Sequence, residues 1–206
     1  TLIAQTQSYV SRLMNKTTMS VRTCEAFCYE QGALIFAVHA GVTCQCGVRQ
    51  PKHSLTEVDM KYYCDEPCGG NKTETCGGSQ ASALYAIQPQ QGACNAGYVF
   101  FGDRCYKYVS TEMSQPDALE HCKADGALLS SMRTRTENNF VLSLPYVANL
   151  SNHYTTYRTW TGAVVDNSKS QFRWLDGSAW GFASWRYGEP NALDSEDCVE
   201  AFNNYP

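Results

Sequence analysis

The sequence predicts two small, disulfide-rich α+β domains. Eleven cysteines are spread over 206 residues, a density typical of chains that fold in an oxidising compartment. Seven of them lie in residues 1–87, which contain no tryptophan, whereas residues 94–206 contain all four tryptophans. The Gln-, Pro- and Gly-containing stretch at 88–93 separates these two compositions, so we expect a linker there. The chain is long enough for each half to bury a core of its own.

Composition argues against two classes of partner. The formal net charge is -4, and the scattered Lys and Arg residues form no basic stripe, so nucleic acid is not expected. The longest apolar stretch, at 33–42, is far shorter than the roughly 20 residues that cross a bilayer, so no membrane-spanning segment is expected in this chain. Three N-glycosylation sequons, at Asn15, Asn71 and Asn149, favour an extracellular location, either at the cell surface or secreted.

Cysteine spacing in the first half predicts a helix and a strand joined by disulfides. Thr23 is expected to cap a short helix that carries Cys24 and Cys28 on one face. Cys44 and Cys46 project from one face of an extended strand. Because neighbouring cysteines on one element point the same way, each is expected to bond a cysteine of a different element rather than its neighbour. A zinc site built from these pairs is the alternative, although no histidine lies at ligand spacing.

These residues, "TCEAFCYEQG" and "TCQCG" followed by "CDEPCGGNKTETCGGSQASALYAI", resemble a WSC domain over residues 1–87. WSC domains carry eight cysteines in four disulfides, and seven are present here. They are Cys24, Cys28, Cys44, Cys46, Cys64, Cys68 and Cys76. We therefore expect the first cysteine of the family to lie upstream of residue 1, which leaves one of the seven without a partner in this chain.

The WSC resemblance implies carbohydrate binding, as in cell-wall sensors, although many such modules have no established ligand. No acidic cluster or aromatic platform singles out a sugar site in this half. Tyr29, Phe36, Tyr62 and Tyr63 are expected to be packing residues rather than sugar-stacking ones.

The second half begins with a hairpin pattern. Cys94 and Cys105 flank an aromatic run that is interrupted by Gly102 and Asp103, which predicts a β-hairpin closed by a disulfide.

Two helix patterns and several aromatic-rich strands follow. Ser114 is expected to cap the first helix, and Thr134 with Glu137 has the capping-box spacing at the start of the second. Strands are expected at 158–165, 170–178 and 180–185. Helices that precede such strands indicate an α+β domain in which two helices flank antiparallel sheets.

This half closely resembles a C-type lectin domain over residues 94–206. The matching motifs, in order, are Cys94…Cys105-Tyr106, Cys122, Gly126-Ala127-x-Leu129, Trp160-Thr161-Gly162-Ala163, Trp174-Leu175-Asp176-Gly177, Trp185, Glu189-Pro190-Asn191 and Glu196-Asp197-Cys198-Val199. The resemblance implies a disulfide between Cys94 and Cys105. It also implies that Cys122 and Cys198 pair with cysteines beyond residue 206, so we expect the chain to be an excerpt of a larger protein.

The resemblance further implies one bound calcium ion. Glu189, Asn191 and Glu196 would ligate the ion and bind sugar, and Asp197 would be a further metal ligand; calcium prefers such oxygen ligands. A cis bond before Pro190 would point its neighbours at one ion. Members of the family with Glu-Pro-Asn bind sugars with equatorial 3- and 4-hydroxyls, such as mannose and N-acetylglucosamine, or fucose by related geometry.

An accessory calcium site is expected to be absent or weak. Ser170 and Ala192 stand where the family has acids, and only Asp166 and Asp197 are in register.

Other functions remain open for the loop at 189–197. It could be a solvated acidic loop anchored by Cys198, in a domain that binds protein. The two domains together resemble part of a polycystin-type ectodomain, or a cell-wall or matrix adhesion protein, whose domains serve as assembly surfaces. The expected partners are thus glycans, glycoproteins or neighbouring domains. An enzyme is not expected, since Glu189 and Glu196 share one loop and no carboxylate opposes them.

Overall fold

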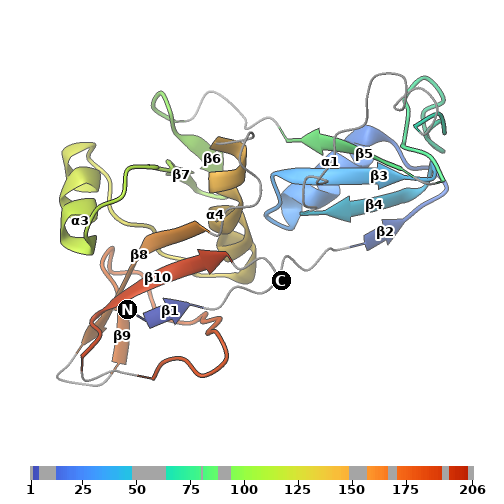
Figure 1. The fold of residues 1–206 in the computed structure, drawn as a ribbon. Coiled ribbons are helices and arrows are strands. Elements are labelled where there is room, and N and C mark those ends of the chain that lie inside the picture. The colour runs from blue at the N-terminus through green and yellow to red at the C-terminus, as the bar shows by residue number, and fades with distance from the viewer. Residues whose placement is uncertain are drawn as a thin grey trace. The chain divides into compact units, whose positions relative to one another are not determined.

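The computed structural model describes residues 2–4, 13–47, 64–79, 81–87, 94–148, 157–166, 171–191 and 195–203. The chain divides into two compact units, which are shown in Figure 1. The N-terminal unit is formed mainly by residues 9–93, and the C-terminal unit by residues 94–145 and 154–206 together with residues 1–8. Within the described part of the chain, no helix is long and apolar enough to span a membrane.

The N-terminal unit contains one helix, α1 (Val21–Glu30), among its described residues. Ser20 caps this helix, because its hydroxyl accepts a hydrogen bond from the Thr23 backbone N–H at 3.0 Å. The expectation that Thr23 is the cap is therefore wrong: Thr23 lies in the first turn and donates to the cap. A carboxylate oxygen of Glu74 accepts from the Val21 N–H at 2.8 Å, which satisfies a second donor at this helix end.

An antiparallel sheet packs beside α1 in the order β2-β4-β3-β5 (Figure 1). Its strands are β2 (Leu13–Asn15), β3 (Ile35–His39), β4 (Thr43–Cys46) and β5 (Ser82–Ala86). Phe36 on the central strand β3 is buried and stacks on Tyr85 with ring centroids 5.2 Å apart. Phe36 is thus a core residue, as predicted; Tyr62 and Tyr63 lie outside the described residues.

Disulfides join the helix to the sheet. Each cysteine of α1 bonds one of β4, in the pairs Cys24–Cys44 and Cys28–Cys46. This confirms the prediction that each of these cysteines bonds a cysteine of another element. The bonded sulfurs are not available for the alternative zinc site. A third bridge, Cys68–Cys76, closes a loop of the same unit.

The C-terminal unit starts with a two-stranded hairpin, β6 (Val99–Phe101) and β7 (Arg104–Tyr106). Gly102 occupies the turn with φ 63°, a conformation that glycine adopts without strain. The Cys94–Cys105 disulfide closes the hairpin, which confirms the sequence prediction.

Two helices follow, α3 (Gln115–Ala124) and α4 (Arg135–Ala148). Ser114 caps α3 as expected, and its hydroxyl accepts from the Asp117 N–H at 3.3 Å. Thr134 accepts from the Glu137 N–H at 3.1 Å at the start of α4. This is the first half of the expected capping box. The Glu137 carboxylate accepts from the Arg133 N–H at 2.7 Å, one residue before the donor that a capping box uses.

The main sheet of this unit has the order β1-β10-β8-β9. Strands β8 (Tyr157–Asp166), β9 (Gln171–Trp174) and β10 (Cys198–Asn203) pair antiparallel. Strand β1 (Leu2–Ala4) pairs parallel to β10 and lies at its edge (Figure 1). The first residues of the chain therefore pair with the second predicted domain rather than with the first.

Residues 180–184 form no strand, so the strand expected at 180–185 is wrong. Its aromatic side chains instead pack on β9. The Trp185 ring lies 4.6 Å from Phe172, and the Trp180 ring lies 4.7 Å from Trp174, measured between centroids. Aromatic residues are common in strands because they pack well on a sheet face. Here Trp180 and Trp185 pack on the side chains of β9, although the segment that carries them is a loop.

Three cysteines have free thiols in the described structure: Cys64, Cys122 and Cys198. This agrees with the expectation that one cysteine of the first domain and two of the second lack partners in this chain. Burial raises the pKa of all three thiols, which keeps them in the less reactive neutral form near pH 7.

We expect the double substitution of Cys24 and Cys44 by Ala to destabilise the N-terminal unit. Loss of one native disulfide costs about 3 kcal/mol, which corresponds to roughly a hundredfold faster exchange of the β3 amides. Hydrogen–deuterium exchange with mass spectrometry measures this rate. The free thiol Cys64 provides the control, because Cys64→Ser removes no bridge of this chain. Unchanged protection of β3 in the double variant would contradict the assignment.

Candidate functional site

The candidate site lies in the long loop between β9 and β10. Near its middle, the chain makes a tight turn in which the Glu189 N–H donates to the Arg186 carbonyl at 2.9 Å. Gly188 stands at the third position of this turn with φ 87°, as a type II turn requires. The turn leads directly into the Glu189–Pro190 peptide bond, which is cis.

Glu189 and Asn191 lie together on this loop. The Asn191 amide donates to one Glu189 carboxylate oxygen, Oε1, at 3.3 Å. The other oxygen, Oε2, is buried and has no hydrogen-bond partner among the described residues. A buried carboxylate oxygen without a partner is costly. A hard cation with oxygen ligands would relieve this cost, so the donor set fits calcium.

Glu196 and Asp197 occupy the other end of the loop. Asp197 is exposed, and its backbone carbonyl accepts from the Val165 N–H at 3.0 Å. Glu196 is half-buried and contributes to a raised pKa of Glu200, for which burial is the main cause.

The structure does not gather these carboxylates around one point. Among the described residues, Cys24, Cys28 and Cys44 are the only group of three His, Cys, Asp or Glu ligand atoms within 4.8 Å of one another. Those cysteines are disulfide-bonded. Glu189 therefore lies beside Asn191, and no described group of three such ligand atoms joins it to Glu196 and Asp197. Ser170 and Ala192, on which the missing accessory site was argued, lie outside the described residues.

Comparison with protein-family models decides the identity of both halves. Residues 4–78 match the model of the WSC domain, and residues 111–205 match that of the Lectin C-type domain. The chain joins a WSC domain to a C-type lectin domain. Both matches confirm the resemblances found from the motifs, while the boundaries 1–87, 88–93 and 94–206 stay predictions.

Curated relatives match about half of this chain. Ladderlectin of Oncorhynchus mykiss is 34% identical over 107 residues, which are 52% of this chain and 54% of that protein. The CD209 antigen of Homo sapiens is 32% identical over 114 residues, which are 54% of this chain and 26% of that protein. The chain thus spans about half or less of the length of these relatives.

Solved structures match a similar share of this chain but most of their own length. Human lithostathine is 22% identical over 55% of this chain and 90% of its own, with a TM-score of 0.46. The C-type lectin CEL-I from Cucumaria echinata is 21% identical over 55% of this chain and 89% of its own, with a TM-score of 0.47.

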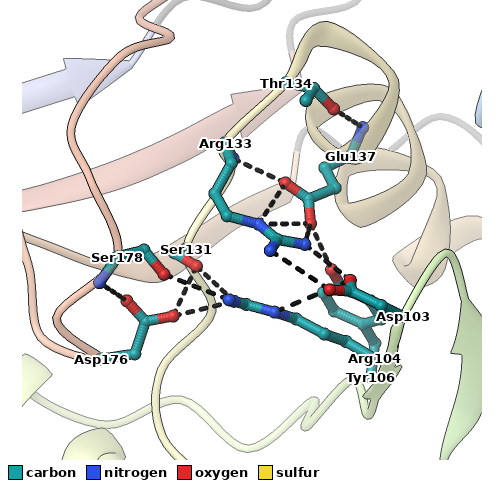
Figure 2. Close-up of polar contacts among 9 residues, drawn as sticks. All are labelled: Asp103, Arg104, Tyr106, Ser131, Arg133, Thr134, Glu137, Asp176 and Ser178. Carbon is teal, nitrogen blue, oxygen red and sulfur yellow. Dashed lines mark hydrogen bonds and ion pairs between the residues drawn. The ribbon is translucent and has the colours of Figure 1, made fainter.

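A half-buried ion pair holds the start of the loop between β9 and β10 in the lectin domain (Figure 2). The guanidinium of Arg104, on β7, donates to a carboxylate oxygen of Asp176 at 2.8 Å and to the Ser131 hydroxyl at 2.6 Å. The other oxygen of Asp176 accepts from the Ser178 N–H at 2.9 Å. Asp176 is the second residue after the end of β9, so this contact fixes the turn from which the loop between β9 and β10 departs.

Asp176 remains ionised because of these contacts. Burial raises its pKa, but hydrogen bonds from two serines and from Arg104 outweigh that effect and lower the pKa from 3.8 to about 2. Charge-assisted bonds of this kind are stronger than neutral ones.

A second ion pair extends the network to the start of α4 (Figure 2). The guanidinium of Arg133 bonds the buried carboxylate of Glu137 and also donates to Asp103 at 2.7 Å. The hydroxyl of Tyr106 donates to Glu137 at 3.1 Å. Burial raises the pKa of Glu137, but these hydrogen bonds outweigh it, so the net pKa is lowered. The hairpin, α4 and the turn after β9 are thereby tied together through charged groups.

No local sequence pattern indicates this network. Asp103 was assigned only to a turn, and Asp176 only to a family motif. Arg104 and Asp176 are 72 positions apart, so no local spacing could have revealed their contact.

We expect Asp176→Asn to destabilise the lectin domain by roughly 2 kcal/mol at pH 7. The folded-state pKa of about 2 lies below the ordinary value of 3.8. The carboxylate therefore contributes its stability above pH 4 and loses it as the pH falls toward 2. The difference between wild type and variant should shrink over that interval.

Urea unfolding followed by tryptophan fluorescence measures this difference, because all four tryptophans lie in the lectin domain. Glu112→Gln removes an exposed carboxylate of the same domain and serves as the matched control. A difference between wild type and Asp176→Asn that stays constant from pH 7 to pH 2 would rule out the ionised contact.

Proposed function

We propose that this chain is an extracellular, calcium-dependent carbohydrate-binding protein that acts through its lectin domain. The observation that carries the proposal is the buried, unpartnered Oε2 of Glu189 beside the Asn191 amide. The match to the Lectin C-type domain, a non-catalytic binding module, supports binding rather than catalysis.

Glu189, Asn191 and Glu196 would hold the ion, with Asp197 as a further ligand. When bound, calcium supplies open coordination positions for two neighbouring sugar hydroxyls. The carboxylate and amide groups of Glu189 and Asn191 would hydrogen-bond those same hydroxyls. The ion and the protein side chains would thus bind the same pair of sugar hydroxyls.

The Glu-Pro-Asn order at 189–191 favours mannose, N-acetylglucosamine or fucose. A Gln-Pro-Asp order would favour galactose instead. A relative from Thalassophryne nattereri, 28% identical over 109 residues, is named a galactose-specific lectin, so the choice of sugar must be tested for this chain itself.

An extracellular setting is supported by the cysteines and by the sequons. Four disulfides are present among the described residues, and such bonds persist in oxidising compartments. Asn15 is exposed on β2 and Asn71 is half-buried in a loop, while Asn149 lies outside the described residues. Glycans or glycoproteins on a cell surface or in a matrix are the proposed partners.

A second function is a protein-binding module in a larger polycystin-like or adhesion ectodomain. The observation that favours it is that Glu189, Glu196 and Asp197 do not form a group of three that could hold a metal ion among the described residues. In that case neighbouring domains, rather than sugars, would contact the loop.

A glycan array with the intact protein, read with calcium and with EDTA, separates the two functions. We expect mannose- or N-acetylglucosamine-terminated glycans to bind with calcium and to be released by EDTA. Glu189→Gln should lose at least tenfold in glycan affinity, because the carboxylate that contacts both ion and sugar is neutralised. Glu112→Gln removes an exposed carboxylate that lies outside this loop in the sequence, and it should bind normally. Binding that ignores EDTA, or none with calcium, would contradict the lectin function.

A further inference from the structure

Tyr187 is the most exposed large apolar side chain among the described residues. Its side chain is 99% exposed, and the next such residue, Leu128, is 43% exposed. A single exposed aromatic residue on a protein surface is ordinary. The position of Tyr187 is what matters, because it lies two residues before Glu189 on the site loop.

The backbone around Tyr187 is held on both sides. The Arg186 guanidinium lies over the ring of Phe202 at 5.3 Å from its centroid, and Phe202 is buried on β10. The hydrogen bond from the Glu189 N–H to the Arg186 carbonyl closes the turn around Tyr187 and Gly188. Tyr187 thus occupies the corner of a fixed turn, while its ring lies almost entirely in solvent.

An exposed aromatic ring on a backbone that is held in place can bind the face of a sugar. Hexoses have one face of C–H groups with partial positive charge, and the face of an aromatic ring is negative. Tyrosine also gives a large contact area at low cost in side-chain entropy, because it has only two rotatable bonds.

We propose that Tyr187 is a stacking platform for the C–H face of the saccharide bound at Glu189 and Asn191. This inference rests on the proposed function and assigns to that site a residue outside the Glu-Pro-Asn motif. The platform contributes affinity through the ring, not through the ion.

Titration calorimetry of the intact protein with methyl α-mannoside, N-acetylglucosamine and mannotriose tests the platform. In saturating calcium, Tyr187→Ala should weaken the binding of at least one of these sugars by about tenfold. Tyr187→Phe keeps the ring and should bind like wild type. Leu128→Ala removes the other exposed apolar side chain of this domain and should also bind like wild type.

A calcium titration of the same variants separates stacking from an effect on the ion site. Tyr187→Ala should bind calcium with wild-type affinity. Equal sugar affinities of wild type and Tyr187→Ala would overturn the platform while leaving the lectin function intact. A parallel loss of calcium and sugar binding in Tyr187→Ala would also overturn it, because the residue would then act by shaping the loop. If wild type binds none of the three sugars in calcium, the proposed function fails and the platform with it.

Discussion

The contact between Arg104 and Asp176 is the constraint on which the candidate site depends. It joins the hairpin to the turn after β9. The Ser131 hydroxyl also donates to Asp176, and the Ser178 hydroxyl accepts from Arg104. Removing one partner of this half-buried pair leaves the other charge without its counter-ion. The loop that carries Glu189 therefore departs from a fixed point, although most of its own residues form no regular structure.

Two further anchors hold the loop along its length. The aromatic rings of Trp180 and Trp185 pack on β9, and Arg186 lies over Phe202 of β10. Between these anchors and β10 the chain presents Glu189 and Asn191 side by side. The WSC domain is held in a different way, by disulfides that join a short helix to a small sheet, as suits a domain whose core is small.

Much of this could be predicted from sequence wherever the determining residues are near one another in the chain. The spacing of Cys24 and Cys28 against Cys44 and Cys46 indicated bridges between two elements, and Ser114 indicated a helix start. Local pattern failed at one helix start and in one aromatic-rich segment. Ser20 rather than Thr23 caps α1 because the helix starts earlier than the cysteine spacing suggested, and residues 180–184 pack as a loop although their composition suits a strand.

Sequence indicates the neighbours within the candidate site only over short separations. Glu189 and Asn191 meet because only a proline separates them, whereas Glu196 and Asp197 lie beyond residues 192–194, whose path no local rule gives. The most direct test of the account is the calcium stoichiometry of the metal-free intact protein, measured by titration calorimetry. We predict one ion per chain, lost in Glu189→Gln. No binding, or one ion still bound by that variant, would contradict the assignment of Glu189 as a calcium ligand.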